Sequence, residues 1–138
     1  SSLGFEVNVG NVVWNQCKDI LTNDESKTRL IYSSDIVNQQ LTMKSYKNTY
    51  KKNYINKAGD TGALMVMNRG YGTGQYNVDY CIIDPDRPYL IENHLICIRN
   101  INALEKETLI ELYKKIIESL NDQKTKDFIE DKAPIEKI

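Results

Sequence analysis

The chain has 138 residues, of which 41% are hydrophobic and 27% are charged, and its net charge is −1. This length fits a single domain with its own core, and the composition is ordinary for a soluble globular protein. The near-neutral charge argues against non-specific coating of polyanions, and no apolar run is long enough to span a bilayer. We therefore expect one domain over residues 1–138 and no membrane partner.

Strands are predicted first along the chain. Apolar residues alternate with polar ones on both sides of Gly10-Asn11, which predicts a hairpin or a bent strand over 5–14. Further strands are predicted, in chain order, at 30–32, 62–69, 76–84 and 95–99. Pro85 and Pro88 predict a turn after the third of these.

Helical periodicity is clear only near the end of the chain. The apolar residues that recur at helical spacing are Leu109, Leu112, Tyr113, Ile116, Ile117 and Leu120. Asn102 and Glu105 fit a capping box at the start of this helix, and a short second helix is predicted from Thr125 to Lys132. Strands followed by helices predict an α+β fold: a mostly antiparallel or mixed, strand-rich part, then one long and one short C-terminal helix.

The cysteines and the histidine give no sign of a metal site. Cys17, Cys81 and Cys97 are widely spaced, and none of them forms a CxxC pair. Cys81 and Cys97 lie in apolar runs, which favours reduced core thiols in a cytoplasmic protein. Because His94 is the only histidine, we expect no structural metal site.

A glycine-rich stretch, "MNRGYGTGQY" over 67–76, follows the apolar run at 62–69. Its G-x-G-x-G pattern matches neither a dinucleotide fingerprint nor a P-loop, and a strand rather than a helix is predicted after it. Without a helix N-terminus, the usual cradle for a pyrophosphate is absent. The stretch is interpreted as a hairpin whose glycines need positive φ, or as a polar loop that approaches a duplex.

Catalytic patterns are weak throughout the chain. Ser33, Ser34, Asp35 and His94 supply the residue types of a serine hydrolase, but no G-x-S-x-G elbow surrounds the serines. Acid-x-Lys triplets, typical of some nucleases, include Asp122-Gln123-Lys124 and Glu130-Asp131-Lys132 in the charged tail, where a solvated helix face explains them. We therefore expect no catalytic residue in this chain.

Positive charge is concentrated between Asp35 and Asp60, where five lysines occur without any acidic residue and tyrosines are interleaved with them. Lysine and arginine attract phosphates, whereas Asn, Gln and Arg can hydrogen-bond to base edges. The candidate DNA-binding residues are Lys44, Lys47, Lys51 and Lys52 in the lysine-rich segment, Asn68, Arg69, Gly70, Tyr71, Gly72 and Thr73 in the glycine loop, Asn15 and Gln16, and Asn93 and His94. The alternative for each of them is a polar surface that only faces water.

Several sequence segments, taken in their order along the chain, resemble a known family of domains. "VGNVVWNQCKDILTND", "TRLIYSSDI", "KKNYI", "VMNRGYGTGQYNVDYCII" and "YLIENHLICIRN" follow one another along the chain. Over nearly its whole length the chain resembles the target-recognition domain that lies C-terminal to the catalytic domain in adenine-specific (N6) DNA methyltransferases of bacterial restriction–modification systems. The most specific pieces are "VVWNQ", "NRGYGTG" and "ENHLICIR". The chain is also distantly similar to the recognition domains of type I specificity subunits.

This resemblance implies a division of labour. The catalytic domain of the parent enzyme would bind S-adenosylmethionine and flip the adenine. Its [NDS]-PP-[YF] motif has no counterpart here, because Asp84-Pro85-Asp86 lacks the second adjacent proline and the aromatic residue. We expect a fragment of a larger methyltransferase, with no methyl transfer or cofactor of its own. Its partners would be double-stranded DNA and the methyltransferase catalytic domain in the same chain.

Two other functions are open on the sequence alone. One is a small restriction nuclease domain. The other is a protein-interaction module that docks through the amphipathic helix predicted near the end of the chain.

Overall fold

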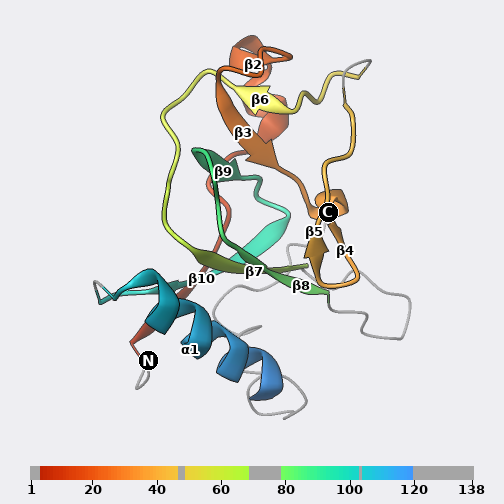
Figure 1. Ribbon diagram of the computed structural model, residues 1–138. Coiled ribbons are helices and arrows are strands. Elements are labelled where there is room, and N and C mark those ends of the chain that lie inside the picture. Colours follow the sequence, from red (N-terminus) through yellow and green to blue (C-terminus); the bar gives the residue numbers. More distant parts are fainter. Residues whose placement is uncertain (1–3, 47–48, 69–78, 103, 120–138) are drawn as a thin grey trace.

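The structure is a computed structural model, and it describes residues 4–46, 49–68, 79–102 and 104–119 (Figure 1). The strands are β1 (Phe5–Val9), β2 (Leu21–Thr22), β3 (Thr28–Ile31), β4 (Ile36–Val37), β5 (Gln40–Leu41), β6 (Tyr54–Ile55), β7 (Leu64–Asn68), β8 (Tyr80–Ile83), β9 (Tyr89–Ile91) and β10 (Leu95–Asn100). The helical elements are the 3-10 turns η1 (Trp14–Gln16), η2 (Lys18–Ile20) and η3 (Ser33–Asp35), and the α-helix α1 (Lys106–Ser119). Strands followed by one long helix confirm the predicted α+β class. The short helix predicted at 125–132 lies outside the described residues.

The strands form two four-stranded sheets and a small ribbon. The first sheet has the order β1-β10-β7-β8 and is antiparallel throughout. The second has the order β2-β6-β3-β9 and is mixed, because β3 and β9 run parallel. β4 and β5 pair with each other alone.

The first sheet is buried on both of its faces. Leu64 and Val66 of β7 belong to the core between the two sheets, whereas Met65 and Met67 belong to the core between the first sheet and α1. Alternate side chains of a strand point to opposite faces, so a strand covered on both sides is apolar at every position. This explains the continuous apolar run from which the strand was predicted.

Helix α1 covers the outer face of the first sheet (Figure 1). Its buried Tyr113 ring lies 5.9 Å from the ring of Phe5 on β1. The helix begins at Lys106, so the predicted capping box is wrong: Asn102 lies outside the helix, and its N–H donates to the side chain of Asn100.

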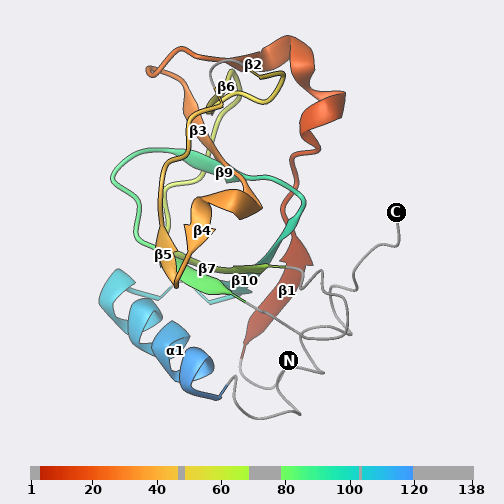
Figure 2. The same ribbon diagram turned by 90° about the vertical axis from the view of Figure 1, so that its right-hand side faces the viewer.

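β1 ends at Val9 and pairs with β10, so the hairpin predicted over 5–14 is wrong and the predicted bend is found. The chain then crosses from the first sheet to the second (Figure 2). It can do so only at a glycine. A Cβ on Gly10 would come far inside van der Waals contact of the carbonyl oxygens of Ile91 and Glu92.

β7 and β8 are arranged as the two strands of the predicted hairpin. These strands pair antiparallel, with Leu64 opposite Ile83 and Met67 opposite Tyr80. A strand, and not a helix, therefore follows the glycine loop. Residues 69–78 of the loop itself lie outside the described residues.

Candidate nucleic-acid interface

Trp14 is the centre of a cluster of lysines and aromatic rings. The Nζ of Lys18 lies 5.5 Å from the centroid of the Trp14 ring, and the Nζ of Lys51 lies 5.4 Å from it. Lys18 is also 5.3 Å from the ring of Tyr50, and Lys51 is 5.4 Å from the ring of Tyr32. We call these five residues the lysine–aromatic cluster. It joins η1 and η2 to the lysine-rich segment, which is distant from them in sequence.

The charges of this cluster are not neutralised by acids. No described carboxylate forms an ion pair with Lys18 or Lys51, and both are held against the same ring. Aromatic faces attract cations, but only weakly where solvent is near, so an anion that approaches either ammonium group would be attracted to it. Tyr50 is 79% exposed and leaves a ring available for stacking beside them.

An open hollow adjoins the cluster. It is lined by Lys18, Tyr50, Lys52, Leu21 and Thr49. Two of the predicted lysines, Lys51 and Lys52, are therefore at or beside the cluster. Trp14, Lys18 and Tyr50 were not among the predicted residues, although the interleaving of tyrosines with lysines was the signal that could have indicated Tyr50.

Buried hydrogen bonds hold the lysine-rich segment in place. The carboxylate of Asp35, which is 1% exposed, accepts hydrogen bonds from the Lys44 N–H at 3.2 Å and from the Tyr46 hydroxyl at 3.1 Å. The side chain of Asn53 accepts from the Tyr46 N–H at 3.0 Å and donates to the Lys44 carbonyl at 2.6 Å. The backbone at residues 44–46 is thus held in place before any ligand binds.

Two tyrosines connect these hydrogen bonds to the cluster. The Tyr32 and Tyr46 rings lie 4.6 Å apart, and the Tyr32 hydroxyl donates to the Lys52 carbonyl at 2.7 Å. Burial raises the pKa of Tyr46 to about 12, and burial likewise raises the pKa of Tyr32. Both hydroxyls are therefore neutral hydrogen-bonding groups at physiological pH.

The predicted polar segments also meet in space. The Asn93 N–H donates to the Val12 carbonyl at 2.8 Å, and the Gly10 N–H donates to the Leu95 carbonyl at 2.9 Å. The turn with Asn93 and His94, between β9 and β10, is thereby placed beside the chain that leads into η1, where Asn15 and Gln16 are exposed. Asn68 lies opposite Leu95 across the β7–β10 ladder, which sets the start of the glycine loop next to the same turn.

A buried acid fixes His94. Glu92 is 2% exposed, and its Oε1 lies 2.7 Å from His94 Nδ1 and accepts a hydrogen bond from the His94 N–H at 3.1 Å. Glu92 Oε2 is buried without a hydrogen-bond partner among the described residues. Sequence reasoning missed Glu92, because glutamate is ordinarily exposed and nothing in its neighbours indicates burial.

The remaining predicted residues divide into two groups. Lys44 is exposed, but it lines a different hollow with Met43 and Asn53, and no contact places it in the lysine–aromatic cluster. Those outside the described residues are Lys47, Arg69, Gly70, Tyr71, Gly72 and Thr73.

The competing functions find little support in the described part of the chain. The residue types of a hydrolase do not converge there, because Asp35 binds Tyr46 and backbone groups, whereas His94 pairs with Glu92. No group of three or more His, Cys, Asp or Glu among these residues could hold a metal ion. The apolar face of α1, which a docking module would expose, packs on the first sheet.

Comparison with known proteins gave no match: no family model, curated protein or solved structure is detectably similar to the chain. None of the helices in the described ranges has the length and apolar character needed to cross a membrane. A function for the chain therefore has to be argued from the site itself.

Proposed function

We propose that the chain is a sequence-specific recognition domain for double-stranded DNA. The observation that carries this proposal is the pair Lys18 and Lys51, held against the Trp14 ring without an acidic partner among the described residues. Basic groups combined with aromatic rings are typical of surfaces that bind nucleic acids. Asn15 and Gln16 directly follow Trp14 of this cluster, and Asn93 is hydrogen-bonded to Val12, two residues before Trp14. These segments supply polar groups without a formal charge.

The two kinds of residue have different tasks. Lysines of the cluster, together with Lys52, hold phosphates and set the orientation of the duplex. Asn15, Gln16, Asn93 and His94 offer hydrogen-bonding groups that can distinguish base edges. Asn68 and the glycine loop after it would add the remaining contacts, and Arg69 is the residue expected to read a base directly.

The parent protein would be an adenine-specific DNA methyltransferase of a bacterial restriction–modification system, acting in the cytoplasm. What supports this is the resemblance of "VVWNQ", "NRGYGTG" and "ENHLICIR" to its recognition domains. S-adenosylmethionine and the flipped adenine would belong to the catalytic domain, and no residue of this chain is assigned to either of them. The chain alone would transfer no methyl group.

Selection from a pool of randomised duplexes tests the proposal. The chain should enrich a defined site, and that site should bind tighter than a shuffled duplex of the same composition. Arg69→Ala should change which sites are enriched, whereas Lys51→Ala combined with Lys52→Ala should weaken binding to every duplex equally. If no sequence is enriched, or if both variants act equally on all sequences, the assigned roles are wrong.

A further inference from the structure

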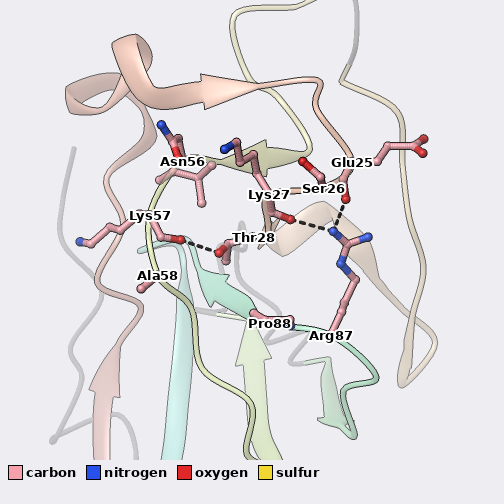
Figure 3. A pocket seen from close by; sticks show the side chains of 10 residues that line it. Glu25, Ser26, Lys27, Thr28, Asn56, Lys57, Ala58, Arg87 and Pro88 are labelled. Atoms are coloured by element: carbon pink, nitrogen blue, oxygen red, sulfur yellow. Dashed lines mark hydrogen bonds between the residues drawn. The ribbon is translucent and has the colours of Figure 1, made fainter.

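A second basic site lies at the opposite end of the second sheet. The turn at 92–94 follows the carboxyl end of β9, whereas this site surrounds the starts of β3 and β9, which run parallel. It is an open pocket of about 580 Å³, and its lining includes Lys27, Lys57 and Arg87 (Figure 3). Lys57 is one of the five lysines between Asp35 and Asp60, whereas Lys27 and Arg87 lie outside that segment.

Arg87 is fixed at one side of the pocket. Its Nη2 donates to the carbonyl of Lys27 at 2.7 Å and also to the carbonyl of Glu25. Its guanidinium carbon lies 5.0 Å from the centroid of the Tyr54 ring, which is a stacking contact. The Arg87 guanidinium is thereby held beneath the turn that carries Lys27. Its charge adds to the positive potential of the pocket.

Lys57 is fixed on another side. The hydroxyl of Thr28 donates to the Lys57 carbonyl, so this backbone lies close against β3. Gly59 then allows the chain to pass β9, because a Cβ there would clash with the backbone of Tyr89 and the methyl group of Thr28. The Lys57 backbone is thereby held beside the pocket, and its side chain extends outward from the rim in Figure 3. The flexible four-carbon stem of a lysine allows this ammonium group to turn toward an anion in the pocket.

The charge balance of the pocket favours an anion. Its lining has three cations and one acid, Glu25, whose side chain points away from Lys27 and Lys57 (Figure 3). Asp24 is also near Lys27, but its carboxylate accepts hydrogen bonds from the Ser26 N–H at 2.9 Å and hydroxyl at 2.7 Å. No ion pair engages Lys27 or Lys57 within the described ranges.

We infer that this pocket binds a phosphate group. Lys27 and Lys57 make the charged contacts, Asn56 adds an amide donor, and Arg87 is a positioning residue that holds Lys27. Within the described residues, the aromatic ring in contact with one of these cations is that of Tyr54, which is buried beneath Arg87, so a base cannot stack on it. The ligand is therefore recognised through its phosphate alone, either as a phosphodiester of a nucleic-acid backbone or as a free phosphate.

Titration with inorganic phosphate, followed by amide NMR shifts, tests the site without relying on the proposed DNA recognition. Shifts should concentrate at residues 26–28, 56–58 and 87. Lys27→Met combined with Lys57→Met keeps the aliphatic stems and should abolish these shifts. The control Lys115→Met, at an exposed position of α1, should leave them intact. Equal shifts at lysines over the whole surface, or unchanged shifts in the double variant, would overturn the inference.

A second titration with a short duplex distinguishes the two sources of phosphate. If the duplex shifts the same amides, and the double variant lowers the salt dependence of duplex binding by about 0.9 for each lysine, the ligand is the DNA backbone. If inorganic phosphate shifts these amides and the duplex does not, the ligand is a free phosphate. Failure of duplex recognition at the lysine–aromatic cluster would leave the phosphate titration unaffected, so the two proposals can fail separately.

Discussion

The Nζ of Lys51 lies 5.4 Å from the centroid of the Trp14 ring, and this contact joins the lysine-rich segment to the turn that follows β1. Lys18 approaches the same ring to 5.5 Å. One indole therefore positions two cations from separate parts of the chain. Trp14 is a positioning residue in the proposed function, because the proposed phosphate contacts are those of Lys18 and Lys51.

Replacing Trp14 should weaken duplex binding without regard to sequence. Each cation–π contact contributes about 0.5–1 kcal/mol at exposed sites. Trp14 makes two of them, so we expect Trp14→Ala to lower affinity for all duplexes by roughly fivefold to thirtyfold, whereas Trp14→Phe should retain part of the affinity. Fluorescence anisotropy, at a temperature where both variants are folded, measures this. Equal affinities for the wild type and Trp14→Ala would contradict the positioning role.

Gly10 should tolerate no side chain. A Cβ at this position would clash with the carbonyl oxygens of Ile91 and Glu92, so Gly10→Ala should lower the free energy of unfolding by about 1–3 kcal/mol. Gly62 provides a matched control, because a Cβ there would meet nothing within 4 Å. Gly62→Ala should be neutral or slightly stabilising. Urea unfolding of both variants measures the difference in their free energies of unfolding. Equal stabilities would show that the chain at Gly10 has room for a Cβ.

The sequence was sufficient to predict the long elements of the fold. β7, β10 and α1 are long and strongly periodic or continuously apolar, and they were predicted within a few residues of their observed bounds. β2, β6 and β9 have only two or three residues, and their pairing depends on partners far away in sequence. No local pattern could have indicated them.

The residue types of the candidate site could be predicted from the sequence, but the central residue, Trp14, could not. Lysine, asparagine and glutamine are visible as types suited to DNA, and the segments 15–16, 51–52 and 93–94 were all predicted. Trp14 was overlooked because an isolated tryptophan after an apolar run is usually part of a core. Its role follows only from the tertiary contact with Lys51.

Removing the buried carboxylate of Asp35 should destabilise the fold. Asp35→Asn keeps the shape of the side chain, but an NH2 group replaces one of two accepting oxygens. It then faces either the Tyr46 hydroxyl and the Lys44 N–H, which donate to Oδ1, or the Tyr32 N–H, which donates to Oδ2. We expect a loss of about 1–3 kcal/mol in the free energy of unfolding. Asp84→Asn is the control, since the Asp84–Lys106 ion pair is exposed to solvent and should contribute little to stability. A smaller loss for Asp35→Asn than for Asp84→Asn would contradict the account.

The buried Tyr46 hydroxyl should make stability depend on alkaline pH. Burial raises the pKa of Tyr46 from 10.0 to about 12, so folding favours the protonated form. The resulting stability is complete below pH 10 and is lost as pH rises toward about 12. Unfolding in urea across this range should show a decline that is smaller in Tyr46→Phe, which has no hydroxyl to ionise. Identical pH profiles for the two proteins would show that Tyr46 is not the group responsible.

The salt dependence of duplex binding tests whether Lys18 and Lys51 of the lysine–aromatic cluster contact DNA phosphates. Lys18→Met combined with Lys51→Met removes the charges of the lysine–aromatic cluster but keeps the aliphatic stems, and Lys115→Met on α1 is the control. If both lysines contact phosphates, the slope of log affinity against log salt should decrease by about 0.9 for each of them, and affinity should fall for every sequence. The control should retain the wild-type slope. A double variant with the wild-type slope and affinity would show that the duplex does not bind at this cluster.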